Sequence, residues 1–116
     1  MKLFAQSLRA AYSADTCHPS YLNKWSSTNP TAGQCAITAL LVHEKFGYDI
    51  YEVKINRSRH FFNVTPAGDV IDLTAEQFAQ PISYAERTKR EPQALYRSCQ
   101  QRLNILKQNL HQGGAL

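Results

Sequence analysis

The chain has 116 residues, of which 43% are hydrophobic and 19% are charged, and its net charge is +4. This balance suits one globular domain over residues 1–116 and excludes a disordered chain. The excess of lysine and arginine over acidic residues is small and scattered, which argues against nucleic acid as a partner. No segment reaches the ~20 apolar residues of a membrane span, and the three widely spaced cysteines match neither a disulfide framework nor a zinc site.

The N-terminal segment 2–14 is predicted to be an amphipathic helix. Its apolar residues recur at helical spacing: Leu3, Phe4, Leu8, Ala11 and Tyr12. Polar residues interrupt the apolar run at Gln6, Ser7 and Arg9, which argues against a signal peptide. We therefore expect a soluble, cytoplasmic protein with reduced cysteines. Loop-forming residues dominate the following segment, 15–27.

The stretch GQCAITALLVHEKFG, residues 33–47, predicts the central helix of the domain, because its body is apolar on nearly all sides. Two starts are compatible with the sequence. Asn29 can cap a helix that has Pro30 in its first turn, or a short turn can precede a start near Gln34. Gly47 is expected to end the helix.

The remainder of the chain predicts an antiparallel sheet followed by a helix. Strand patterns occupy 49–56, 60–65 and 70–73. A helical turn is expected at 75–78 and a helix over about 92–110, whereas 80–90 fits no single element. The order helix, helix, strands, helix predicts an α+β fold with its core in residues 25–78, in which the central helix packs on the small sheet.

The connection Pro66-Ala67-Gly68 matches a three-residue hairpin loop, with proline in the first turn position and glycine in the left-handed position. In this register Phe62 pairs with Asp72. His60 and Asp72 then lie on one face of the ribbon as diagonal neighbours. A four-residue loop would instead place them on opposite faces.

Cys35 is the candidate nucleophile. A thiolate near a helix N-terminus is stabilised by free N–H groups, by the helix dipole and by a neighbouring imidazole. His60 is the candidate base, and Asp72 is the acceptor that orients its ring. The backbone N–H of Cys35 could donate to an oxyanion, with the side-chain amide of Gln34 or of Asn29 as a second donor.

Each of these three residues also has a purely structural interpretation. A cysteine at the start of a core helix is most often packing, and Asp72 can cap the turn that follows it. His60 can be a strand-end residue beside two phenylalanines. The protein would then be a binding module whose aromatic residues line a groove for a peptide or protein: Trp25, Tyr48, Tyr51, Phe61 and Tyr84.

Basic residues give two further hypotheses. Arg57 and Arg59 flank the candidate base and could bind a carboxylate or phosphate of a substrate, although such residues are more often solvated. A nucleic-acid interface would instead use the arginines and lysine of the C-terminal half: Arg87, Lys89, Arg90, Arg97 and Arg102.

The stretches NPTAGQCAITALLV, HFFN and IDLTAEQF, with Trp25 upstream, resemble the YunG-like family of small bacterial proteins. The similarity is densest over residues 25–78. Phe61 and Phe62 stand where the family pattern has Tyr and Trp, while His60 and Asn63 match it.

The Gly-Gln-Cys step also resembles the nucleophile step of transglutaminases, which is followed by His and Asp on successive strands. The resemblance implies a minimal papain-like or transglutaminase-like core, with Cys35 as nucleophile, His60 as base and Asp72 as orienting residue. Asn63 is a further candidate for a supporting role in the site. It implies acyl transfer through a thioester, as in an amidase, peptidase, deamidase or transglutaminase, on an amide or ester substrate such as a peptide or protein. No metal or organic cofactor is needed, and substrate-binding walls of larger transglutaminases are missing.

Overall fold

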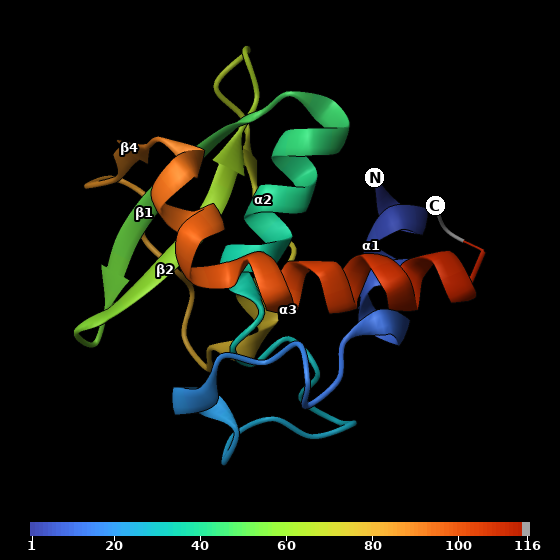
Figure 1. Ribbon diagram of the computed structural model, residues 1–116. Helices are drawn as coiled ribbons and strands as arrows, with labels where there is room; N and C mark the ends of the chain where they lie inside the picture. Colours follow the sequence, from blue (N-terminus) through green and yellow to red (C-terminus); the bar gives the residue numbers. More distant parts are fainter. Residues whose placement is uncertain (115–116) are drawn as a thin grey trace.

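The computed structural model describes residues 1–114, which form three α-helices and one four-stranded antiparallel sheet (Figure 1). The helices are α1 (Lys2–Ala11), α2 (Cys35–Phe46) and α3 (Pro92–Gln112). The strands are β1 (Asp49–Ile55), β2 (Ser58–Val64), β3 (Val70–Ile71) and β4 (Thr88–Arg90). Short 3-10 turns lie at η1 (Pro19–Tyr21) and η2 (Ala75–Gln77). The predicted α+β class is confirmed.

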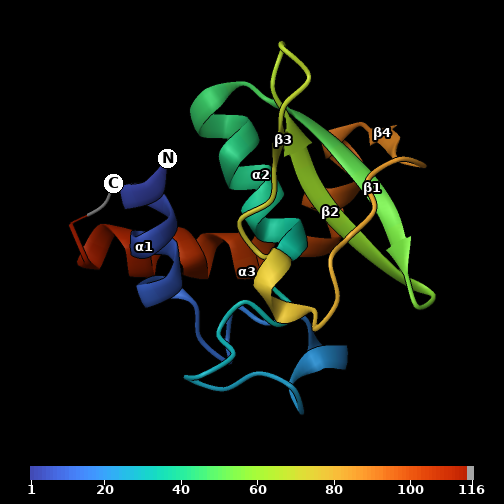
Figure 2. The same cartoon turned by 180° about the vertical axis from the view of Figure 1, so that it is seen from behind.

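Helix α2 is the central element of the fold. It packs against α3 on one side and against β1 and β2 on the other (Figures 1 and 2). Ile37, Leu40 and Val42 are fully buried, as a helix that is apolar all round requires. The hydrophobic core also takes residues from α1 and α3, from Phe4 to Leu110. No helix within residues 1–114 is long and apolar enough to cross a membrane.

Helix α2 begins at Cys35, which is the later of the two starts compatible with the sequence. Asn29 does not cap it, because residues 29–34 fold into tight turns closed by the bonds Ala32 N–H to Asn29 C=O and Gln34 N–H to Thr31 C=O. At the other end, Gly47 adopts a left-handed φ of 77° and closes the helix as predicted.

Helices α1 and α3 have different lengths from those predicted. Helix α1 ends at Ala11 because Tyr12 turns to extended backbone. The Tyr12 ring enters the core, where its hydroxyl lies 2.6 Å from the Thr38 hydroxyl. Helix α3 continues to Gln112, two residues beyond the predicted end.

The β1–β2 connection is a two-residue turn, Asn56-Arg57, and not the predicted loop at 57–59. Both residues have positive φ, 50° and 72°, as in a type I′ hairpin turn. Asparagine tolerates this backbone but arginine rarely adopts it, so the turn signal in the sequence is weak. The strands therefore extend to Ile55 and Ser58, which pair directly.

Replacing Arg57 with glycine is expected to raise the free energy of unfolding by about 0.5–1 kcal/mol, because glycine adopts positive φ without a steric cost. Urea unfolding followed by circular dichroism measures the change. Lys54→Gly, at an exposed position inside β1, is the matched control and should destabilise the protein. A lower stability of Arg57→Gly would show that the turn is not strained by arginine.

The β2–β3 hairpin has the predicted register, with Val64 opposite Val70. Gly68 has a φ of 90°, and the Thr65 N–H donates to the Asp69 carbonyl at 2.9 Å, which closes the three-residue loop. Strand β3 ends at Ile71, two residues earlier than predicted. The following aspartate turns the chain toward η2, because its carboxylate accepts the Thr74 N–H at 3.2 Å.

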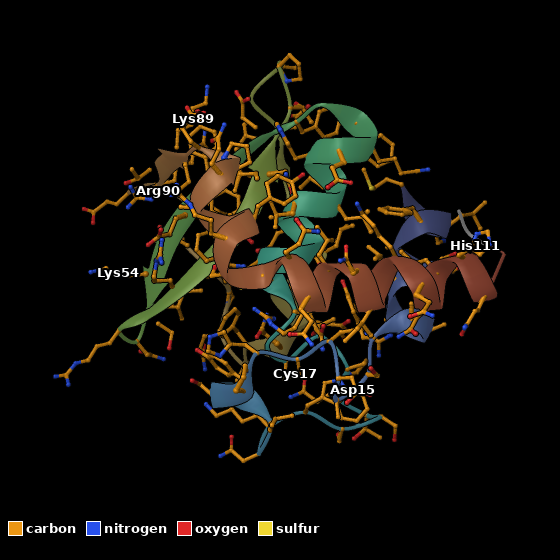
Figure 3. All side chains as sticks on the ribbon, in the orientation of Figure 1. Asp15, Cys17, Lys54, Lys89, Arg90 and His111 are labelled. Atoms are coloured by element: carbon orange, nitrogen blue, oxygen red, sulfur yellow. The ribbon has the colours of Figure 1, made fainter. Side chains whose placement is uncertain are left out.

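Strand β4 was not predicted, because its three residues are exposed and polar and show no alternation. It pairs with β1 at the sheet edge, where Figure 3 places Lys89 and Arg90. Glu52 of β1 is 5% exposed and accepts hydrogen bonds from Arg59 and Arg90, each at 2.9 Å. Burial alone would raise the pKa of Glu52, but these two guanidinium groups outweigh burial and lower it.

Candidate active site

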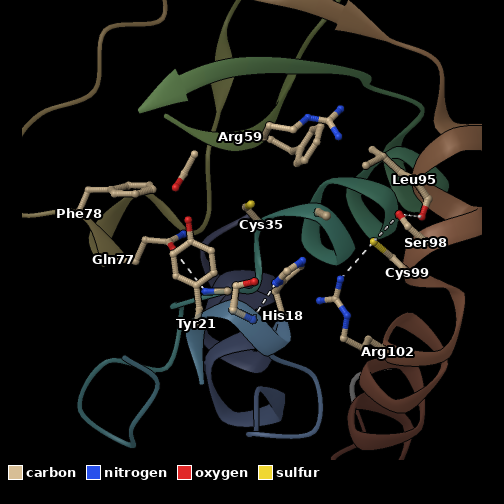
Figure 4. A pocket seen from close by; sticks show the side chains of 15 residues that line it. His18, Tyr21, Cys35, Arg59, Gln77, Phe78, Leu95, Ser98, Cys99 and Arg102 are labelled. Atoms are coloured by element: carbon tan, nitrogen blue, oxygen red, sulfur yellow. Dashed lines mark hydrogen bonds between the residues drawn. The ribbon is translucent and has the colours of Figure 1, made fainter. Parts of the chain in front are cut away.

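Cys35 lies where the most buried helix meets a cavity of about 330 Å³. The cavity lies between the loop before α2, strand β2, turn η2 and helix α3 (Figure 4). Cys35 is only partly buried, and it lines this cavity. Its backbone N–H has no acceptor within residues 1–114, as expected for the first residue of a helix. The sulfur is therefore accessible beside a free backbone donor.

Gly33 allows the chain to pass closely between two other segments just before Cys35. It has a φ of 71°, and a Cβ at this position would lie 2.5 Å from the Cys17 sulfur. Its carbonyl accepts the His18 N–H at 2.9 Å, and its N–H donates to the Gln77 side chain at 3.3 Å. These bonds hold the entry to α2 against η1 and η2.

His60 and Asp72 meet as the hairpin register predicts. The Nε2 of His60 lies 2.6 Å from the Oδ2 of Asp72. The imidazole is fully buried, and the carboxylate is 4% exposed. Asp72 also accepts hydrogen bonds from the hydroxyl of Tyr84 at 2.7 Å and from the N–H of Thr74. The carboxylate is thus held in place from several directions.

Cys35 also affects the pKa of the His60 imidazole. Burial alone would lower the pKa of His60, but the hydrogen bond to Asp72, the interaction with Cys35 and the charges of both residues outweigh burial and raise it to about 9. The Nδ1 of His60 has no hydrogen-bond partner within residues 1–114, so Cys35 acts on the ring without a formed hydrogen bond. Catalytic hydrogen bonds often form fully only when substrate is bound. Cys35, His60 and Asp72 are therefore brought together.

Aromatic side chains pack around His60. The ring of Phe78 meets it edge-on, with 4.9 Å between ring centroids, and Phe62 stacks at 6.3 Å. Tyr84 completes this layer by packing on Phe62 and bonding to Asp72. Burial and the bond to Asp72 both raise the pKa of Tyr84, so its phenol stays protonated and donates.

Gln34 does not supply the expected second oxyanion donor. Its buried side chain accepts the Thr16 hydroxyl at 2.8 Å and donates to the Ser13 carbonyl at 3.3 Å. Asn29 is also committed elsewhere, because its amide donates to the Lys24 carbonyl at 3.0 Å. Neither side chain lines the cavity, which leaves the backbone N–H of Cys35 as the donor beside the sulfur.

Asn63 and Trp25 have structural bonds rather than places in the cavity. Asn63 donates to the Ala39 carbonyl at 3.0 Å and so ties β2 to the middle of α2. The indole N–H of Trp25 donates to the Pro30 carbonyl at 3.1 Å and closes the loop before α2.

Of the two arginines expected at the substrate site, only Arg59 lines the cavity, where it lies over the Phe61 ring. Arg57 is at the exposed tip of the β1–β2 turn. The aromatic groove of the binding-module hypothesis is not assembled around the cavity, because Phe61 is the one member of that set in its lining.

Sequence reasoning missed several residues around the sulfur. Gln77, Arg102 and Cys99 line the cavity (Figure 4). Tyr84 supports Asp72 through a hydrogen bond. None of them stands in a local pattern that signals such a role. Within residues 1–114, no group of three or more His, Cys, Asp or Glu side chains is arranged to hold a metal ion.

Comparison with known proteins gives two matches. The model of the family described as YunG protein matches residues 1–114. The "Uncharacterized protein YunG" of Bacillus subtilis (strain 168) is 42% identical over 62 residues, which cover 53% of this chain and 53% of that protein. The match thus spans about half the length of this relative. No solved structure matches the chain.

Proposed function

The chain belongs to the YunG family, and we propose that it is a cysteine-dependent acyl-transfer enzyme. One observation carries the proposal: an accessible thiol at a helix N-terminus influences the protonation of a buried imidazole that a buried carboxylate orients at 2.6 Å. A nucleophile, a base and an orienting acceptor in this relation are the parts that covalent acyl transfer requires.

In the first half of the reaction, the Cys35 thiolate attacks the carbonyl carbon of an amide or ester and a C–S bond forms. The carbonyl oxygen takes the electron pair, and the free N–H of Cys35 supports its negative charge. Collapse of this intermediate breaks the bond to the leaving group. The His60 imidazolium gives its proton to the departing amine or alkoxide, and a thioester remains on Cys35.

In the second half, neutral His60 removes a proton from an incoming nucleophile, which attacks the thioester and restores the thiolate and the imidazolium. Water makes the reaction a hydrolysis, as in an amidase, peptidase or deamidase. An amine makes it a transfer, as in a transglutaminase. Asp72 keeps the ring oriented through both halves, and Tyr84 and Thr74 keep Asp72 in place.

We extend the proposal to a minimal papain-like or transglutaminase-like core. The supporting features are the cysteine at the start of a central helix and the histidine and aspartate from successive segments of an antiparallel hairpin. A shared arrangement of this kind does not identify a substrate.

The direct test is acylation by p-nitrophenyl acetate, a small activated ester. We expect rapid addition of one acetyl group to Cys35 at neutral pH, detected by intact mass and located by peptide mapping. Cys99→Ser removes the other thiol in the cavity lining and should acylate normally, whereas Cys35→Ser should not. If Cys35 reacts no faster than Cys99, the enzyme hypothesis fails and a catalytically silent peptide- or protein-binding module becomes the better interpretation.

A further inference from the structure

Arg102 of α3 is a cation in the wall of the cavity that contains Cys35. Its guanidinium donates to the Thr16 carbonyl and to the Cys99 sulfur, each at 3.2 Å. A guanidinium carries five N–H donors, so the others have no protein acceptor within residues 1–114. Arg102 forms no salt bridge with a carboxylate in this part of the chain.

The second arginine of the cavity differs from Arg102 in this respect. Arg59 is paired with Glu52 at 2.9 Å, and that carboxylate also binds Arg90. The cavity lining contains no aspartate or glutamate. Arg102 therefore places an uncompensated positive charge in a partly enclosed space, where a charge-assisted bond to an anion is stronger than in open water.

The position of Arg102 is fixed by its two bonds. Figure 4 shows its side chain rising from α3 toward Cys99, with His18 on the neighbouring side. Its charge reaches His18, where burial and then Arg102 lower the pKa of the imidazole. His18 is thus disposed to stay neutral at pH 7, which leaves Arg102 as the charged group at this end of the cavity.

We propose that the cavity selects acyl donors that carry a carboxylate, with the acyl carbon at Cys35 and the carboxylate bound by Arg102. The substrate class is a small amide or ester of a dicarboxylic acid. A volume of about 330 Å³ lies at the small end of ligand sites, ~300–1,000 Å³, and suits such a molecule. This inference rests on the proposed function, because it assigns the substrate of the same site.

The test compares two activated esters of similar length, the p-nitrophenyl half-ester of glutaric acid and p-nitrophenyl butyrate. The parent protein should acylate Cys35 faster with the carboxylate-bearing ester, by about 10- to 100-fold in second-order rate at low salt. Arg102→Gln should remove this preference, measured as the ratio of the two rates. Arg102→Lys should restore part of it, and Arg59→Gln, the matched arginine of the same cavity, should retain it.

A second measurement separates this inference from the proposed chemistry. Glutarate is titrated into Cys35→Ser protein, and binding is followed through the amide NMR signals of His18 and Ser98, which line the cavity. Saturable shifts that disappear in the double variant Cys35→Ser/Arg102→Gln support the anion site. If these shifts are seen but neither ester acylates Cys35, only the acyl-transfer proposal fails. Acylation at equal rates by both esters, or the same preference in Arg102→Gln, overturns the inference and leaves the acyl-transfer proposal in place.

Discussion

Asp72→Ala is expected to lower the free energy of unfolding by about 3–5 kcal/mol at pH 7, because it removes one partner of a buried ion pair. His60 would be left fully buried with no acceptor at Nε2. Burial is then opposed only by Cys35, so the pKa of His60 should fall clearly from about 9. Urea unfolding measures the stability, and an NMR titration of the ring protons measures the pKa.

Two further variants should cause smaller losses of stability than Asp72→Ala, and a third variant is a control. Asp72→Asn keeps an acceptor for the ring but no charge, so the His60 pKa should fall with a smaller loss of stability. Tyr84→Phe removes one hydrogen bond to Asp72 and should cost about 1 kcal/mol. Asp69→Ala, at an exposed position of the same hairpin, should change neither quantity. A His60 pKa that stays near 9 in Asp72→Ala would contradict the role given to the carboxylate.

His60→Gln is expected to slow the alkylation of Cys35 by iodoacetamide at pH 6 by about 100-fold. A free thiol with a pKa near 8.5 is only ~0.3% thiolate at pH 6, whereas an imidazolium neighbour keeps a much larger fraction ionised. Glutamine fills much of the space of histidine and can donate to Asp72, but it cannot be protonated. His18→Gln, at the other histidine beside the cavity, should react like the parent protein. Equal rates for the parent and His60→Gln would remove His60 from the mechanism.

The difference in stability between the parent protein and His60→Gln should decrease as the pH rises. The folded pKa of His60 is raised to about 9 from an unfolded value of about 6.5. The protonated ring therefore contributes its full stabilisation below about pH 6.5, and this contribution is lost as the pH rises through about 9. The stability advantage of the parent over His60→Gln should shrink over this range. An advantage that grows with pH would mean that the ring is held neutral.

The hairpin at residues 66–68 explains why part of the site could be predicted from the sequence. Proline and glycine specify the turn locally, the turn sets the register, and the register places His60 and Asp72 together. Gly47 gives an equally local signal for the end of α2.

The partners of polar side chains could not be predicted in this way. Gln34 lies next to the nucleophile in sequence, yet the segment 13–16 takes both ends of its amide. Tyr84 and Arg102 reach the site from irregular or distant parts of the chain, where no period or motif marks them. Such placements depend on tertiary packing, which a local pattern does not contain.

Cys35 is the first residue of α2, so the position of the nucleophile depends on the most deeply buried helix of the protein. Segments this deeply packed exchange their amide protons only when the whole molecule opens, whereas sites on loops can fluctuate independently. Amide exchange at the middle of α2 should therefore be the slowest in the chain. The enhanced reactivity of Cys35 at pH 6 should therefore be lost over the same temperature range as the cooperative unfolding transition. A labelling assay at this pH would then report the folded population.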